Sequence, residues 1–186
     1  MSVFQPLTLS QIRRDPESHR QIRVYADGAY DLFHYGHMEQ LKQAKTAFKN
    51  IYLIVGVVTD ADCLQFKSGP TVMTHEERVK SVECCTFVDE VIAYPPFYPT
   101  IAFANKHEID LVAHDSIPYE INNTVSTIDD CYEPFKRADR FLETIRTPVI
   151  STTELVERII SRADEYRLRN IKRGVLSMKD VEAIIG

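Results

Sequence analysis

Two histidines, His34 and His37, flank a glycine in the run His-Tyr-Gly-His, directly before a stretch whose apolar residues have helical spacing. A helix start offers unpaired backbone amides and the positive end of the helix dipole, and Gly36 lets the backbone come close to an anion. Each imidazole can also donate to phosphoryl oxygens. The run therefore predicts a phosphate-binding loop.

Histidines three residues apart are also typical of a metal site or of a solvated pair. A third histidine, His114, follows a short apolar run and precedes Asp115. Zinc binding by His34, His37 and His114 is compatible with this spacing. However, the sequence has no pattern of thiolates or orienting carboxylates around them. The glycine and the strand ahead of it favour the phosphate interpretation.

Other chemistries have weaker signals. The chain contains no Gly-x-Ser-x-Gly elbow and no Walker pattern, although Lys67, before Gly69, is a flexible cation that could reach a phosphate. The cysteines form no CxxC pair and are too few for a secreted disulfide scaffold. We expect them to be reduced and mostly buried: Cys63, Cys84, Cys85 and Cys131.

Strands and helices alternate along the chain. Runs rich in β-branched and apolar residues predict four strands, at 22–26, 51–58, 88–93 and 110–113. Periodic spacing predicts helices from His37 and near 100–106, and capping boxes at 74–77 and 151–154 mark two more helix starts. The last long helix, from about Thr153, has an apolar face that we expect to pack on a core.

This order predicts an α/β fold, an open parallel sheet with helices on both faces and a C-terminal helical segment. We expect an N-terminal segment at 1–20, a catalytic domain at 21–150 and the helical segment at 151–186. Ligands of such sheets bind beyond the carboxyl ends of the strands. We therefore expect the ligand-binding loops to be those that follow the four strands, after Ala26, Val58, Ala93 and Ala113.

Composition narrows the range of partners. With 186 residues, 44% of them hydrophobic, the chain can bury one substantial core. A net charge of −5 and the lack of a Lys and Arg stripe argue against a nucleic-acid partner. There is no signal-peptide core and no apolar run long enough to cross a bilayer. We expect a soluble protein of the cytoplasm or nucleus, without stable membrane insertion.

Five motifs in the same order and at nearly the same spacing carry a family resemblance over about residues 22–173. They resemble choline-phosphate cytidylyltransferase, of the cytidylyltransferase family within the HxGH nucleotidyltransferase superfamily. The motifs are Asp-Gly-Ala-Tyr-Asp-Leu-Phe-His-Tyr-Gly-His at 27–37, Leu-Ile-Val-Gly-Val at 53–57, Val-Asp-Glu-Val at 88–91, Val-Ala-His-Asp at 112–115 with Ile-Pro-Tyr at 117–119, and Arg-Thr at 146–147 with Ile-Ser-Thr-Thr at 150–153.

The resemblance implies a Rossmann-like nucleotidyltransferase that makes CDP-choline and pyrophosphate from CTP and phosphocholine with Mg²⁺, by in-line attack without a covalent intermediate. It assigns catalytic roles to His34, His37, Lys67 and Arg146. It implies that CTP carries the metal, with no direct protein ligand. The implied CTP-binding residues are Asp27, Gly28, Tyr30, His34, Gly36, His37, Lys67, Phe97, His114, Arg146, Thr147, Ser151 and Thr152.

A related enzyme acts on phosphoethanolamine and shares much of this pattern. A trimethylammonium head cannot donate N–H bonds and is best held by aromatic faces and a carboxylate, whereas a primary ammonium needs acceptors. Asp115, Tyr119 and Tyr132, with Lys67 on the phosphate, could supply such a site. We therefore favour phosphocholine, with phosphoethanolamine as the alternative. Loop packing is an equally good interpretation of the two tyrosines on residue type alone.

Several positions depart from the family pattern. The family usually has Trp at Phe97, a second Asp at Ser116, Arg at Thr86 near a dimer contact, and a polar or acidic residue with Gly at Pro148-Val149; Ser68 is an extra residue. These departures raise a further alternative, a catalytically weak nucleotide-binding homologue.

The resemblance also implies a homodimer. The tail 177–186 lacks the length and basic face of the family's membrane-binding helix, so we expect no tight membrane binding.

Overall fold

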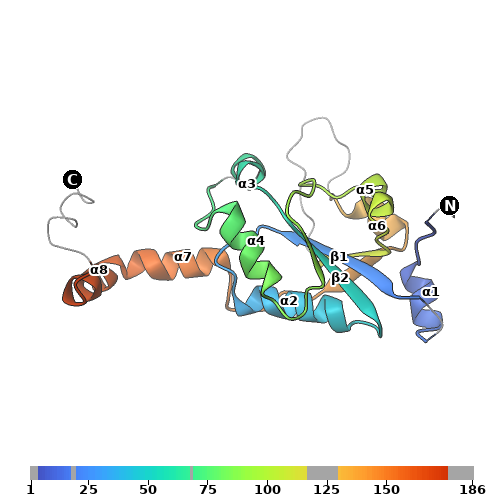
Figure 1. Cartoon of the computed structure of the whole chain (residues 1–186), viewed down its shortest axis with the longest axis horizontal. Coiled ribbons are helices and arrows are strands. Elements are labelled where there is room, and N and C mark those ends of the chain that lie inside the picture. The colour runs from blue at the N-terminus through green and yellow to red at the C-terminus, as the bar shows by residue number, and fades with distance from the viewer. Residues whose placement is uncertain (1–3, 18–19, 68, 117–129, 176–186) are drawn as a thin grey trace. The chain divides into compact units, whose positions relative to one another are not determined.

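A computed structural model describes residues 4–17, 20–67, 69–116 and 130–175, and Figure 1 shows its course. The chain divides into two compact units, residues 1–148 and 149–186. In the described part of the chain, the first unit contains a five-stranded sheet, and the second contains two helices. Tyr119, Ser68 and the tail 177–186, which carry predictions from the sequence, lie outside the described residues.

The sheet has the strand order β3-β2-β1-β4-β5, and every neighbouring pair is parallel. Its arrangement confirms the predicted open parallel sheet. The four expected strands are all present, with shifted ends, and a fifth strand was missed by the sequence prediction. The strands are β1 (Ile22–Gly28), β2 (Ile51–Val57), β3 (Glu90–Ile92), β4 (Leu111–Asp115) and β5 (Phe141–Thr144).

One face of the sheet is covered by α1 (Leu9–Arg14), α2 (Tyr35–Thr46) and α4 (His75–Glu83). Side chains of alternate strand residues meet these helices in one buried cluster, in which Ile12 of α1 and Leu41 of α2 are fully buried. Because burial of a large aliphatic side chain contributes about 1.5–3 kcal/mol, these contacts fix α1 and α2 on the sheet. Helix α1 thus packs within the first unit.

The opposite face carries α5 (Ile101–Lys106) and α6 (Glu133–Arg137) over a second cluster. Its centre is Tyr25 of β1, fully buried with its ring edge-on to Phe103 at 5.3 Å. The tyrosine lies over Gly56 of β2, where an added Cβ would come within 2.1 Å of the Tyr25 hydroxyl oxygen. Gly56 is therefore required by this close approach.

Helix starts follow local capping signals. Thr74 caps α4 in the expected capping box, and Ser151 caps α7 by accepting from the Glu154 amide. Two starts that the sequence prediction missed have the same type of signal: Thr8 forms a capping box with Gln11 at α1, and Thr59 accepts from the Asp62 amide at α3 (Asp60–Phe66). Both could have been found by the rule that found Thr74.

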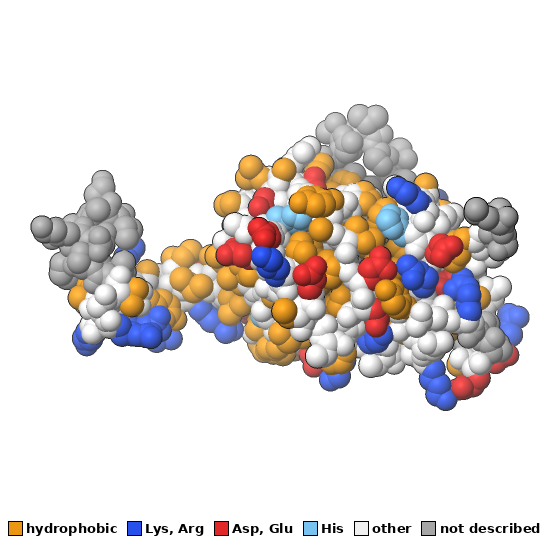
Figure 2. Space-filling model, viewed as in Figure 1, with side chains coloured by type: hydrophobic (Ala, Val, Ile, Leu, Met, Phe, Trp, Pro, Cys, Tyr) orange, Lys and Arg blue, Asp and Glu red, His pale blue; other side chains and the backbone are white. Residues whose placement is uncertain are grey.

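The second unit consists of α7 (Thr152–Ser161) and α8 (Ala163–Lys172). A single long helix was expected, but the chain breaks at Arg162. Neither helix has a buried residue, and Ile159 and Ile160 are 48% and 62% exposed, so the two helices form no core of their own. Figure 2 shows hydrophobic side chains along α7. No helix among the described residues is long and apolar enough to cross a membrane.

Candidate active site

Strand β1 delivers Asp27 to the carboxyl end of the sheet. The strand continues to Gly28, two residues beyond its predicted end, because it pairs with β2 through Gly28 and Val57. Asp27 is buried at 6% exposure, and the Tyr132 hydroxyl donates to both of its carboxylate oxygens at 3.2 Å. Burial raises the pKa of Asp27, against the opposing effects of His114, Tyr132 and Lys67.

A small open pocket of about 270 Å³ lies beside Asp27. It opens where three central strands end, the place expected for a ligand in a parallel sheet. Six predicted site residues other than His34 and His37 line this pocket, together with two residues that the sequence analysis did not assign to a site. The lining residues are Asp27, Gly28, Val58, Lys67, Phe97, His114, Cys131 and Tyr132.

The predicted phosphate loop leads into α2, which begins at Tyr35 with His34 as its N-cap, two residues earlier than expected. Gly36 is the second residue of the helix. The rings of His34 and His37 stack with centroids 3.8 Å apart, and the His34 amide donates to Nδ1 of His37 at 3.4 Å. Phe33 stacks on His37 as well, at 5.7 Å. The two histidines therefore form one ordered pair at the helix start.

The electrostatics of the site favour a neutral His37. Burial, reinforced by the charges of His34 and Lys67, lowers the pKa of His37 to about 3. Since Nδ1 of His37 accepts a hydrogen bond, the neutral ring carries its proton on Nε2. His37 can thus donate one hydrogen bond to an anion at neutral pH without being a cation.

Lys67 brings the positive charge to the pocket. It is the C-cap of α3, and its amide donates to the Cys63 carbonyl at 2.8 Å. The side chain is exposed overall, but its charged end is surrounded by protein atoms, so burial lowers the pKa of Lys67 against the attraction of Cys63 and Asp27. An anionic ligand in the pocket would raise the pKa of Lys67 again and favour its charged form.

His114 and Tyr132 form the opposite wall, with stacked rings 4.6 Å apart. Burial alone would lower the pKa of His114, but its hydrogen bond to Asp115 and the charge of Asp27 raise it. His114 is therefore the histidine that these carboxylates favour in its cationic form. Phe97 completes the aromatic lining and stacks on Phe66 at 4.6 Å.

The zinc hypothesis is not supported by the arrangement of the histidines. Among the described residues, which include His34, His37 and His114, no group of three His, Cys, Asp or Glu side chains could hold a metal ion. All four cysteines are free thiols, and three of them are buried, while Cys84 is exposed. The cysteine prediction is thus confirmed.

The predicted site residues that follow β5 are not among the residues that line the pocket. Arg146 is exposed and Thr147 is partly buried, and both follow β5 at the sheet edge where Asp115 ends β4. Ser151 and Thr152 belong to the second unit, where Ser151 is the N-cap of α7. Val149, where the resemblance led us to expect glycine, has φ = 60°, a left-handed conformation that strains a β-branched residue.

Two pocket residues, Val58 and Cys131, escaped the sequence analysis. Val58 could have been found, because it directly follows β2 at the carboxyl edge. Cys131 had no usable signal, since its segment lies far along the chain from the predicted strands. Burial raises the pKa of its thiol to about 12, so it lines the pocket as a neutral group.

An open parallel sheet whose first strand leads to a histidine-bearing helix start, with a pocket at the strand ends, places the chain among Rossmann-like α/β proteins. A solved structure of the lipopolysaccharide core biosynthesis protein from Thermoplasma volcanium has the same fold, with a TM-score of 0.51 and 17% identity over 68% of this chain and 98% of that one. Residues 25–158 match the family model described as cytidylyltransferase-like, and the chain belongs to that family.

Three named relatives from this family are similar to the chain over most of its length. Choline-phosphate cytidylyltransferase 2 of Arabidopsis thaliana is 47% identical over 84% of this chain and 51% of its own. Choline-phosphate cytidylyltransferase A of Homo sapiens is 45% identical over 90% and 44%. Ethanolamine-phosphate cytidylyltransferase of Mus musculus is 42% identical over 79% and 35%. The chain spans about half the length of these relatives or less.

Proposed function

We propose that the protein transfers the cytidylyl group of CTP to phosphocholine and releases pyrophosphate. The observation that carries this proposal is the pocket at the strand ends, which combines a buried carboxylate, a lysine and three aromatic or imidazole rings. A zwitterion with a phosphate at one end and a quaternary ammonium at the other matches this set of groups. The identity to choline-phosphate cytidylyltransferases supports the same substrate.

In the proposed reaction, a phosphate oxygen of phosphocholine attacks the α-phosphorus of CTP in line. A new P–O bond forms as the bond to the β-phosphate oxygen breaks, so the products are CDP-choline and pyrophosphate. No protein nucleophile takes part. Catalysis then depends on positioning and on stabilising charge in the transition state.

The site residues divide this work. His34 and His37 at the start of α2 donate to the triphosphate, with His37 acting through its Nε2–H. Lys67 neutralises phosphate charge between the two substrates. We further propose that Arg146, Thr147, Ser151 and Thr152 close on the nucleotide phosphates. The α2 dipole adds a favourable field for the same anions.

The quaternary ammonium is assigned to the Asp27 side of the pocket. Asp27 provides negative charge, and the rings of Phe97 and Tyr132 provide the faces that attract a methylated cation. Tyr132 was predicted for this role and Asp27 for CTP, so the pocket extends the role of Asp27 to the second substrate. Asp115, which was also predicted to bind phosphocholine, pairs with His114. The same role for Tyr119 stays a prediction.

Two further parts of the proposal concern Mg²⁺ and assembly. Mg²⁺ would enter on the triphosphate and neutralise charge on the leaving pyrophosphate, and the Lys67 and histidine donor set fits an anion that brings its own metal. Chelation with EDTA should abolish turnover, and added Mg²⁺ should restore it.

We also propose a homodimer, for which light scattering of purified protein should give twice 21.4 kDa.

The deciding experiment is pyrophosphate release with CTP, Mg²⁺ and either phosphocholine or phosphoethanolamine. We expect the larger kcat/KM with phosphocholine and a loss of about 10²–10³-fold in His37→Ala. His107→Ala, a histidine at the end of α5 outside the pocket lining, is the matched control and should stay active. A preference for phosphoethanolamine would select the alternative substrate. CTP binding by calorimetry without turnover would select the catalytically weak homologue.

A further inference from the structure

Asp31 joins the phosphate loop to the segment that follows Lys67. Its carboxylate is buried at 6% exposure and accepts two backbone hydrogen bonds from that segment. Oδ2 accepts from the Val72 amide at 2.8 Å, and Oδ1 accepts from the Met73 amide at 2.9 Å. A carboxylate that accepts backbone amides makes charge-assisted bonds, which are about twice as strong as neutral ones. Asp31 therefore fixes the course of the chain just before α4.

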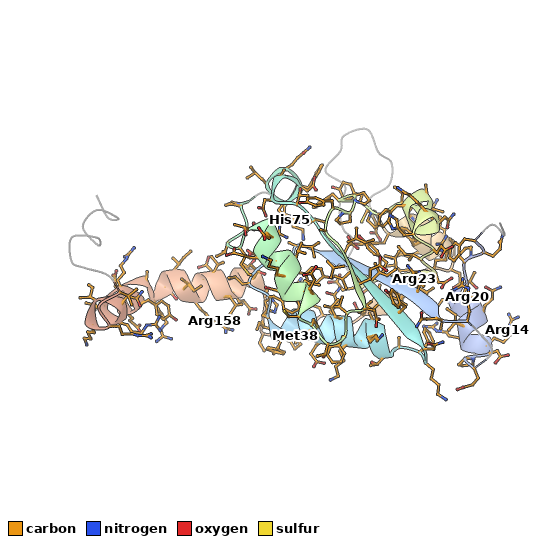
Figure 3. All side chains as sticks on the ribbon, viewed as in Figure 1. Arg14, Arg20, Arg23, Met38, His75 and Arg158 are labelled. Carbon is orange, nitrogen blue, oxygen red and sulfur yellow. The ribbon has the colours of Figure 1, made fainter. Side chains whose placement is uncertain are left out.

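A second tie runs in parallel through Arg78 of α4, which is fully buried. One end of its guanidinium donates to the Ala29 carbonyl, and the other donates to Asp60 at 2.6 Å. Asp60 in turn accepts from the Thr71 hydroxyl and the His75 amide, both at 3.1 Å. Figure 3 labels His75 at the start of α4. The segment between α3 and α4 is thus held from two sides.

These ties also explain how the phosphate loop keeps a strained backbone. Tyr30 and Leu32, which flank Asp31, have φ of 54° and 46°. A left-handed conformation is unfavourable for a residue other than glycine, and it persists where the surrounding contacts hold it in place. Ala29 and Asp31, on either side of Tyr30, are the points at which α4 and its leading segment hold this loop.

Lys67 lies between the two anchored parts. Its backbone is bonded to the end of α3, and the chain is next fixed at Val72 and Met73 by Asp31. Asp31 is not among the pocket-lining residues, so it does not act on a ligand there directly. We propose that Asp31 is a positioning residue, which sets Lys67 against the histidine pair by clamping Val72 and Met73, five and six residues beyond the lysine. This inference rests on the proposed function.

The test is a double-mutant cycle of Asp31→Asn and Lys67→Ala in the pyrophosphate-release assay. Asparagine keeps the shape but presents an NH₂ group to one of the two amides. We expect Asp31→Asn alone to lower kcat/KM by about 10–100-fold, mainly through kcat. In the Lys67→Ala background, the same change should cost less than about threefold, because residues that act as a unit are not additive. Additive losses would overturn the proposal.

Hydrogen exchange of the Val72 and Met73 amides supplies a readout that needs no turnover. Both amides should lose protection in Asp31→Asn, and retained protection would contradict the clamp. The matched control is Asp110→Asn, a buried carboxylate that also accepts two backbone amides, at the other end of the sheet; it should leave kcat unchanged.

If Asp31→Asn does not fold, Asp60→Asn tests the same segment, since its side chain is 50% exposed. An Asp60→Asn enzyme with wild-type kcat would overturn the proposal.

The two proposals fail in different ways. If the wild-type protein releases no pyrophosphate, the proposed function fails, whatever the amide exchange shows. If the wild type is active and Asp31→Asn matches it in kcat/KM, the positioning role fails and the proposed function stands.

Discussion

Two buried carboxylates lie at opposite ends of the same sheet and are treated very differently by their surroundings. At the amino end, Asp110 is fully buried and bonded to the Arg20 guanidinium at 2.7 and 2.8 Å and to the amides of Leu7 and Arg23. At the carboxyl end, Asp27 receives the Tyr132 hydroxyl at 3.2 Å, and burial raises its pKa. Figure 3 labels Arg20 and Arg23 near α1.

The contrast between Asp110 and Asp27 shows which carboxylate supports folding and which supports ligand binding. The bonds around Asp110 tie the N-terminal segment to the sheet and compensate the cost of burying a charge. The surroundings of Asp27 leave part of that cost uncompensated, in a pocket that is open to a ligand. Groups with perturbed pKa cluster at functional sites for this reason, and the carboxyl end of this sheet follows the pattern.

Asp110→Asn should give the largest effect on folding. We expect a loss of about 3 kcal/mol in the free energy of unfolding, because the change removes the charge from several hydrogen bonds at a buried site. Urea denaturation measures it. Once folded, the variant should keep wild-type kcat/KM. A fall in kcat/KM would mean that the two ends of the sheet are not independent.

Asp27→Asn should show the reverse. We expect kcat/KM for phosphocholine to fall about 100-fold, or about 2.7 kcal/mol, because the pocket loses the charge that faces the quaternary ammonium. Stability should stay the same or rise, since a neutral side chain of equal shape avoids the burial cost of the carboxylate. A variant that unfolds more easily yet turns over normally would contradict the comparison.

The pH dependence of stability should reveal His37. Its pKa is about 3 in the folded protein and 6.5 in the reference state. Between these pH values, the unfolded chain binds a proton at His37 and the folded protein does not. This contribution is complete above pH 6.5 and is lost as the pH falls toward 3, by at most about 1.4 kcal/mol per pH unit. Urea unfolding of wild type and His37→Gln at pH 7 and 5 measures it. Equal pH slopes for the two proteins would contradict the depressed pKa.

Glu90→Gln should have the smallest effect. The Glu90 carboxylate pairs with Arg23 at 3.6 Å at the amino end, and both side chains are partly exposed. Such pairs contribute less than about 1 kcal/mol, so thermal unfolding should shift by a few degrees at most and kcat should not change. A large destabilisation would show that the amino end depends on this pair as well as on Asp110.

Much of the fold could be predicted, because its signals are local. Four strands and the capped start of α4 follow from apolar runs and hydroxyl caps. The strand β5 was missed because four residues that begin with Phe141 form too short a run to stand out. The expected core packing of α7 stays a prediction, since periodicity shows that a face is apolar but not what covers it.

The site was predictable at the level of residue types. His34 and His37 lie at the start of α2, His114 lies near the end of β4, and Lys67 ends α3. The topology of the sheet brings Lys67 and His114 together in the pocket. The bond between Tyr132 and Asp27 joins residues 105 positions apart, and the clamp by Asp31 joins residues 41 and 42 positions apart. Such contacts depend on the packed geometry and have no local signal in the chain.

The fit of Tyr25 over Gly56 has a consequence for how this sequence can change over time. Since a methyl group at position 56 would lie 2.1 Å from the tyrosine oxygen, even alanine is excluded while the tyrosine is present. A lineage could enlarge residue 56 only after residue 25 had become smaller, and the intermediate would carry a cavity in its core. The order of substitutions is therefore fixed, and we expect the two positions to vary as a pair among homologues.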